Sequence, residues 1–104
     1  MEFIRSNKDQ PFFAYVAHNQ PHLGLYVSDT FKGKSRRGLL GDVMAEIDDS
    51  VGQIIKALED ADISKNTLVI FSSDNGATFD VGGVDTEFFT SVGGLRGRKQ
   101  DLYE

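Results

Sequence analysis

Residues 72–76, with the sequence Ser-Ser-Asp-Asn-Gly, contain the best candidate ligands for a metal ion. Asp74 supplies a carboxylate and Asn75 an amide carbonyl, and both are hard oxygen donors that suit Ca²⁺ or Mg²⁺. Two donors are few, because Ca²⁺ takes roughly six to eight oxygens. Asn and Gly also tolerate positive φ, so the spacing alone favours a plain turn over a metal site.

The chain has two histidines. His22 follows Pro21, which restricts the local backbone, and an imidazole placed there can bind an anion or act as a general acid. Without further context the residue suits a solvated loop better. His18 ends an apolar run, and we interpret it as a packed, hydrogen-bonded residue.

Two basic segments are candidates for anion contacts. Residues 93–99, Gly-Gly-Leu-Arg-Gly-Arg-Lys, combine glycines that let backbone amides approach an oxyanion with the compact charge of Lys99. A flexible basic loop is the alternative, and the spacing does not match a Walker A motif. Residues 32–37 hold four of the eleven cations, and we interpret them as a solvated loop in preference to a polyanion contact.

Three predicted elements must position these residues. The aromatic, non-alternating run 11–18 predicts a strand buried on both faces, and the β-branched run 67–72 predicts a second strand. Between them, apolar residues in steps of three and four predict a helix over 37–61: Leu40, Val43, Met44, Ile47, Val51, Ile54, Ile55 and Leu58. The opposite, polar face carries Asp42, Glu46, Asp49, Gln53, Lys56 and Asp60.

Strand, helix and strand in this order predict a βαβ unit with parallel strands. Ligands of open α/β sheets bind beyond the carboxyl ends of the strands, so we expect His22 to approach Asp74 and Asn75. From Gly76 onward the chain holds six of its eleven glycines and no helical period, which is typical of a functional loop or a disordered segment. Two strands and one helix leave open sheet edges, and residues 1–104 are therefore expected to form a single partial domain of a larger α/β protein.

Composition excludes several classes of protein. At 104 residues the chain has room for one domain, and its net charge of −5 argues against nucleic acid and anionic membranes as partners. The absence of cysteine excludes a disulfide framework and a cysteine nucleophile. No apolar run approaches the roughly 18 residues of a transmembrane helix, and the first ten residues are too polar for a signal peptide.

Taken in order, four segments resemble the type I sulfatases of the arylsulfatase and N-acetylgalactosamine-6-sulfatase kind. The segments are Pro11 to Tyr15 running on to His22, Gly41 to Gly52, Asn66 to Gly76, and Gly94 to Gly97 with Lys99. The resemblance implies a βαβ portion of an alkaline-phosphatase-like sandwich with a mostly parallel sheet, followed by a glycine-rich irregular C-terminal segment. It also implies hydrolysis of sulfate monoesters through a formylglycine made from Cys or Ser in a C/S-x-P-x-R motif.

The resemblance assigns roles to four residues. His22 matches a histidine that contacts the sulfate or the leaving-group oxygen, and Lys99 matches a lysine that binds a sulfate oxygen. Asp74 and Asn75 match two ligands of a divalent cation, usually Ca²⁺ and otherwise Mg²⁺. The implied substrate is a sulfated carbohydrate or an aryl sulfate, and members of the family are secreted, periplasmic or lysosomal.

The chain also departs from the family pattern. It has no cysteine and no Ser-x-Pro-x-Arg, so the formylglycine has no counterpart, and the two N-terminal aspartates of the metal site are missing. We therefore expect an internal fragment, about a fifth of a typical chain, that is inactive alone and self-associates through uncovered apolar surface. The alternatives are part of a metal-dependent phosphoesterase of the same superfamily and a non-catalytic interaction module.

Overall fold

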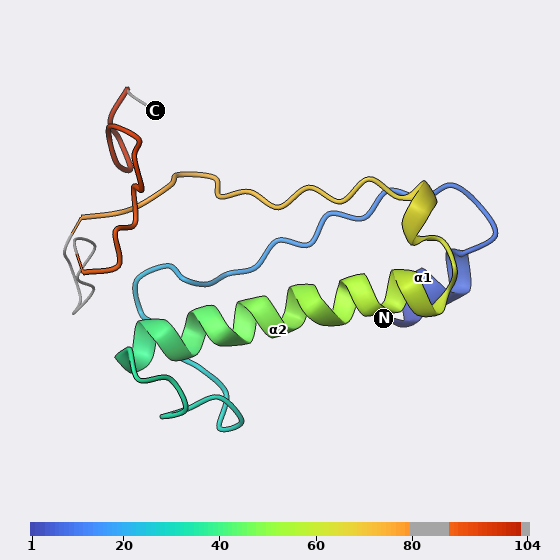
Figure 1. The fold of residues 1–104 in the computed structure, drawn as a ribbon, viewed down its shortest axis with the longest axis horizontal. Helices are drawn as coiled ribbons and strands as arrows, with labels where there is room; N and C mark the ends of the chain where they lie inside the picture. Colours follow the sequence, from blue (N-terminus) through green and yellow to red (C-terminus); the bar gives the residue numbers. More distant parts are fainter. Residues whose placement is uncertain (80–87, 103–104) are drawn as a thin grey trace. The chain divides into compact units, whose positions relative to one another are not determined.

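The computed structural model describes residues 1–79 and 88–102 (Figure 1). Its helices are α1 (Glu2–Asn7), α2 (Gly38–Asp60) and the short 3-10 helix η1 (Ser64–Asn66). By its contacts the chain divides into two compact units, Met1–Val69 and Ile70–Glu104, which we describe separately. The single partial domain stays a prediction.

Helix α2 confirms the helix predicted over 37–61. It runs for 23 residues without proline and turns its apolar stripe inward: Val43, Ala57 and Leu58 are buried, whereas Met44 is about half exposed. The polar face has one exception, because Asp42 is buried with only 4% of its surface exposed. This carboxylate determines how the preceding loop is held, as described below.

The C-terminal end of α2 is closed by a Schellman motif. The backbone N–H of Ile63 donates to the carbonyl of Leu58 at 3.1 Å, and that of Asp62 donates to Glu59 at 2.9 Å. Asp62 has a φ of 58°, the left-handed conformation that this motif requires. The motif therefore satisfies carbonyls that the end of a helix otherwise leaves without partners.

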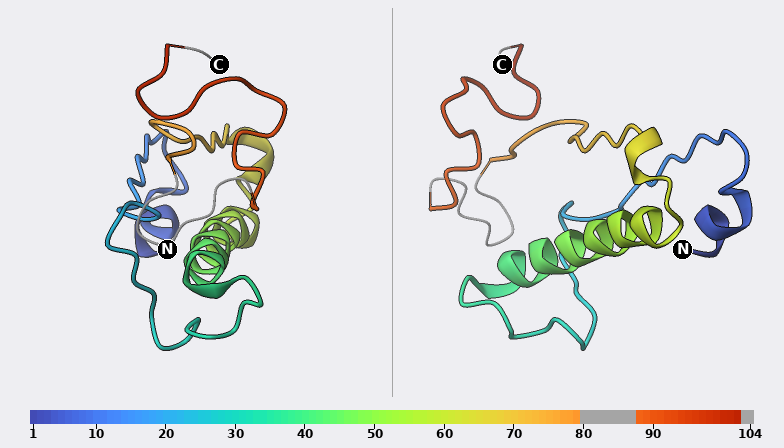
Figure 2. Two further views of the ribbon diagram at one scale, coloured as in Figure 1. Left: turned by 90° about the vertical axis from the view of Figure 1, so that its left-hand side faces the viewer. Right: turned by 45° about the vertical axis from the view of Figure 1, so that its right-hand side comes forward.

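The apolar core of the first unit lies at this same end of α2. Ile4 of α1 packs with Ala57 and Leu58, and Phe12, Ile54 and Ile63 cover the cluster. The rings of Phe3 and Phe12 meet edge to face, with centroids 5.6 Å apart. From this cluster, residues 11–18 run back along α2 toward its N-terminal end, and Figure 2 shows this path from two further sides.

The predicted βαβ sandwich is wrong for the part of the chain that the structure describes, since residues 1–79 and 88–102 contain no strand and no sheet. Residues 11–18 are extended but make no backbone-to-backbone hydrogen bond among the described residues. Phe13 and Tyr15 are 87% and 83% exposed, and Leu68, Ile70 and Phe71 in the second predicted strand are exposed as well. An apolar, β-branched pattern shows only that a segment is suited to a buried strand. Forming the strand also requires neighbouring strands to pair with, because even an isolated two-stranded pair is marginally stable at best.

The described residues of the second unit, 70–79 and 88–102, form turns and bends. Gly93 donates to the carbonyl of Thr90 at 2.7 Å, Leu95 donates to Val92 at 3.0 Å, and the rings of Phe88 and Phe89 pack edge to face. The predicted disorder after Gly76 falls partly on residues 80–87 and 103–104, which lie outside the described residues. Within the described part of the chain, no helix combines the length and the apolar character that a membrane crossing requires.

Candidate functional site

Asp74 and Asn75 lie in a bend, and both are exposed. The backbone N–H of Gly76 donates to the hydroxyl of Ser73 at 3.1 Å, and Gly76 has a φ of 67°, so this short motif is a turn as its composition favours. The turn is closed by its flanking residues. Because both residues are exposed, the carboxylate of Asp74 and the amide of Asn75 are accessible to a ligand.

Lys99 belongs to a second turn in the same unit. The backbone N–H of Arg98 donates to the carboxylate of Asp101 at 2.8 Å, and the N–H of Asp101 donates back to the carbonyl of Arg98, also at 2.8 Å. The N–H of Lys99 donates to the carbonyl of Ala77 at 2.6 Å. This bond places the backbone of Lys99 beside a residue that follows Asp74 by only three positions.

His22 lies exposed in the first unit, with its Nδ1 atom 3.3 Å from the carbonyl oxygen of Leu23. Because a carbonyl only accepts hydrogen bonds, this contact requires the proton on Nδ1. Its predicted approach to Asp74 and Asn75 stays a prediction, since those residues belong to the other unit. His18 is hydrogen-bonded as predicted, with Nε2 3.1 Å from the Ser50 hydroxyl, but it is exposed instead of packed.

The residue that sequence reasoning missed is Asp42. Its carboxylate accepts the backbone N–H of Gly33 at 2.7 Å on one oxygen and that of Ser35 at 2.6 Å on the other. Nearby, the carboxylate of Glu46 accepts the N–H of Ser28 at 3.0 Å. The sequence feature that could have revealed this role is the position of Asp42, an acid one turn into the predicted helix and directly after a basic loop. Backbone N–H groups of such a loop need an acceptor.

Gly41 permits the loop to lie against the start of α2. A Cβ atom at this position would lie 2.6 Å from Cβ of Arg37 and would also contact the hydroxyl of Ser35. The Arg37 atom is fixed to the backbone, so it cannot move aside without moving the loop. Gly41 and Asp42 together therefore hold residues 28–37 against the helix.

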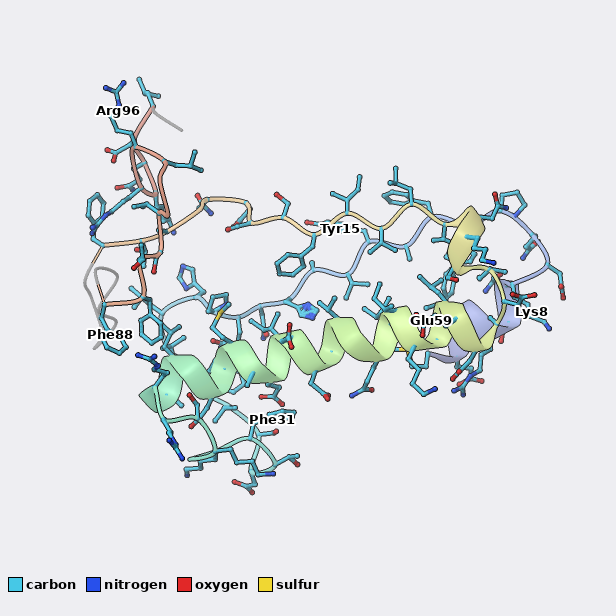
Figure 3. The ribbon with its side chains drawn as sticks, in the orientation of Figure 1. Lys8, Tyr15, Phe31, Glu59, Phe88 and Arg96 are labelled. Atoms are coloured by element: carbon cyan, nitrogen blue, oxygen red, sulfur yellow. The ribbon has the colours of Figure 1, made fainter. Side chains whose placement is uncertain are left out.

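Asp74 and Asn75 supply suitable chemistry for a hard cation but too few donors to enclose one. Among the described residues, no group of three or more His, Asp or Glu side chains is placed to hold a metal ion. An open depression of about 270 Å³ is lined by Arg5, Lys8, Asp60 and Ala61, none of which is a predicted site residue. Figure 3 shows Lys8 near the C-terminal end of α2, where Glu59 also lies.

A sequence model of the Sulfatase family matches residues 1–103. The chain belongs to the sulfatase family. The recognition made from the four ordered segments is therefore confirmed, and with it membership of a family of sulfuric ester hydrolases.

The sulfatase chain is similar to several curated proteins. It is 49% identical over 79 residues to the N-acetylgalactosamine-6-sulfatase of Rattus norvegicus, which covers 74% of this chain and 15% of the relative. It is 37% identical over 107 residues to the N-acetylgalactosamine-6-O-sulfatase of Bacteroides thetaiotaomicron, covering 98% and 21%. The arylsulfatase of Hemicentrotus pulcherrimus is 46% identical over 74 residues, covering 71% and 13%.

This sulfatase chain thus spans about a fifth or less of the length of these relatives. No solved structure matches it significantly.

Proposed function

We propose that this chain is part of a sulfatase that hydrolyses sulfate monoesters of sulfated sugars. In this proposal Asp74 and Asn75 are ligands of a divalent cation, and His22 and Lys99 bind the sulfate group. The family match over residues 1–103 supports the reaction class. Two relatives are named N-acetylgalactosamine-6-sulfatase and N-acetylgalactosamine-6-O-sulfatase, and these names favour a sugar substrate.

The observation that carries the proposal is the hydrogen bond from the N–H of Lys99 to the carbonyl of Ala77, at 2.6 Å. It joins the segment with the proposed sulfate-binding cation to the segment with the proposed metal ligands. Cations and a metal that act on one oxyanion must lie close together, because their stabilisation depends on distance. Both segments are held by turns of their own, which supports a preorganised arrangement.

Asp74 would hold the cation through its carboxylate and Asn75 through its side-chain carbonyl, and both groups suit Ca²⁺ or Mg²⁺. When bound, such an ion supplies positive charge that stabilises a developing oxyanion. The two side chains are exposed and need no rearrangement of the turn to bind. They leave most of the coordination shell to other donors, so we expect this chain to bind Ca²⁺ only weakly.

Lys99 contributes three N–H donors and a compact charge to the sulfate oxygens. His22 would donate a proton or a hydrogen bond to the departing oxygen, which is the role of a general acid. The proposal includes no nucleophile from this chain, which has no cysteine and no Ser-x-Pro-x-Arg. A covalent route without its nucleophile is lost, so the 104-residue chain is expected to give no turnover of an aryl sulfate.

Titration of the ¹⁵N-labelled chain with Ca²⁺ tests the metal ligands. We expect amide shifts at residues 73–77 and a dissociation constant on the order of millimolar, as in the weakest calcium modules. Asp74→Asn should abolish the shifts, whereas the control Asp48→Asn, an exposed acid on α2, should leave them unchanged. Micromolar binding, or shifts confined to the acidic face of α2, would contradict the assignment.

Titration with inorganic sulfate tests the anion ligands in the same spectra. We expect amide shifts near His22 and around Lys99. The shifts around Lys99 should be lost in Lys99→Ala and retained in the control Lys65→Ala. Turnover of an aryl sulfate that His22→Ala abolishes would contradict the expectation that this chain lacks the nucleophile.

A further inference from the structure

Residues 32–37, which we call the basic loop, gather four cations on the surface of the first unit. Lys32, Lys34, Arg36 and Arg37 are all exposed. The chain as a whole carries a net charge of −5, so this concentration of positive charge is local. The basic loop is therefore a local patch of positive charge that attracts anions despite the net negative charge of the chain.

The structure holds the backbone of the basic loop in place. The buried carboxylate of Asp42 accepts the N–H groups of Gly33 and Ser35, the residues that alternate with the two lysines. The N–H of Arg37 donates to the hydroxyl of Ser35 at 2.9 Å. A loop that is already ordered loses less conformational entropy when it binds, so its cations are better suited to recognition than those of a free tail.

This arrangement works against the stability of α2. The helix begins directly after the basic loop, with Arg37 at the N-cap position, no side-chain cap and no acid in its first turn. Cations at the positive end of a helix dipole are unfavourable. Among the residues that the structure describes, Asp42 and Glu46 near the start of α2 accept backbone N–H groups, Asp42 from Gly33 and Ser35 and Glu46 from Ser28. An anion beside Lys32, Lys34 and Arg36 would offset the unfavourable interaction of these cations with the helix dipole.

We propose that the basic loop binds neighbouring sulfate groups of a polymeric sulfated sugar, outside the site of hydrolysis. The inference rests on the proposed function, which supplies the class of ligand, and it extends that function from one sulfate ester to a longer chain. A row of three or four cations fits repeated anionic groups better than one monosulfated sugar. The aromatic residue directly before the basic loop, Phe31, is half-buried (Figure 3), whereas single-stranded nucleic acid is bound on exposed stacking rings.

Binding of an oligosaccharide that contains several 6-sulfated N-acetylgalactosamine residues tests this inference, with its desulfated form as the comparison. The test variant combines Lys32→Ser, Lys34→Ser and Arg36→Ser. The matched control combines Arg5→Ser, Lys8→Ser and Lys65→Ser, and both variants change the net charge from −5 to −8. We expect the test variant to weaken binding about tenfold, as three exposed charge pairs allow, and the control to weaken it by less than about twofold.

Salt and a second variant sharpen the result. Binding should weaken further at about 0.15 M salt, where exposed charges are screened beyond roughly 8 Å. Asp42→Asn keeps all four cations but weakens the hold on the loop, and it should reduce affinity by a smaller factor than the triple variant. Far-UV circular dichroism confirms in each case that α2 is retained.

Three results would overturn the inference: equal loss of binding in the control, equal binding of the desulfated sugar, or tighter binding of a DNA oligonucleotide of the same charge. The proposed function fails separately. Absence of shifts near Asp74 and Lys99 on titration with Ca²⁺ and inorganic sulfate would contradict that function while leaving a loop effect intact. Conversely, normal shifts there with no effect of the loop variant would overturn only the inference about the basic loop.

Discussion

The two ends of α2 are held by different kinds of interaction. At the C-terminal end, Leu58 and Ala57 pack with Ile4 in an apolar cluster, and a Schellman motif closes the helix. At the N-terminal end, the carboxylate of Asp42 and the missing side chain of Gly41 hold a polar, positively charged loop. The C-terminal end is stabilised mainly by an apolar cluster, and the N-terminal end by directed hydrogen bonds together with the burial of Val43, which is 1% exposed.

The two ends of α2 therefore have different roles, one mainly in folding stability and the other in presenting charge at the surface. Apolar packing stabilises a fold in proportion to the apolar area that it removes from water. We therefore expect the C-terminal end of α2 to contribute most of the folding stability of the first unit. At the N-terminal end the cations are exposed, and the buried carboxylate of Asp42 orders the loop that carries them. Substitutions at the two ends should therefore differ in size and in what they change.

The largest effect is expected from Leu58→Ala. Leu58 is 3% exposed, so its truncation leaves a cavity in the cluster at the C-terminal end and should lower the free energy of unfolding by about 3 kcal/mol. Urea unfolding followed by far-UV circular dichroism measures the loss. The matched control is Leu39→Ala at the other end of α2, where the side chain is 45% exposed and the cost should be less than a third as large. Equal costs would contradict the unequal division of stability.

Asp42→Ala should come next, at about 2 kcal/mol. It leaves the N–H groups of Gly33 and Ser35 without their acceptor, and hydrogen bonds to a charged group are each worth roughly 1.5 to 3 kcal/mol before the loop relaxes toward water. Hydrogen exchange should show the loss of protection at Gly33 and Ser35 while α2 beyond its first turns stays protected. Asp48→Ala, an exposed acid on the same helix, is the control, and an equal effect there would show that the carboxylate of Asp42 has no special part.

Sequence patterns predicted the helical part of this fold and not the extended part. The steps of three and four from Leu40 to Leu58 predict α2 to within one residue at each end, because a helix makes its hydrogen bonds within its own segment. The runs 11–18 and 67–72 have the composition of strands, but strand pairing depends on neighbours that composition does not reveal. Asp42 was misplaced on the polar face for a related reason, since its partners Gly33 and Ser35 belong to a loop with no periodicity.

For the candidate site, individual motifs were ambiguous, and their order along the chain was informative. Asn75-Gly76 forms the turn that its composition favours, so the local pattern says nothing about a metal. The resemblance to the sulfatases came from several segments in the right order, and it is this resemblance that gives Asp74 and Lys99 their proposed roles. The family model that matches residues 1–103 confirms the family and does not test those roles. The bond that joins their segments, from Lys99 to Ala77, connects positions 22 residues apart and follows no sequence rule.

A pair of glycine substitutions in α2 should give effects of opposite sign. Gly41→Ala brings a Cβ atom against Arg37 and Ser35, so the gain in helix propensity is cancelled and the free energy of unfolding should fall by about 1 kcal/mol. Gly52→Ala meets no atom within 4 Å and should raise it by about 0.5 to 1 kcal/mol. Urea unfolding of both variants decides the matter, and stabilisation by both would mean that the loop does not approach Gly41 closely.

The smallest effect concerns the exposed ion pair on the C-terminal half of α2. Lys56 Nζ lies 2.9 Å from the carboxylate of Asp60, and this hydrogen bond, together with the attraction between the two charges, raises the pKa of Lys56. A raised pKa in the folded state means that the contribution is fully present below the unfolded pKa of about 10.4 and is lost as the pH rises through the folded pKa. Lys56→Gln should therefore lower stability slightly at neutral pH, and its difference from the parent chain should shrink as the pH rises through the folded pKa of Lys56. Lys65→Gln removes an exposed lysine beyond the end of α2 and controls for net charge. If the stability deficit of Lys56→Gln persisted unchanged at high pH, packing of the lysine stem, and not its charge, would be what stabilises this end of the helix.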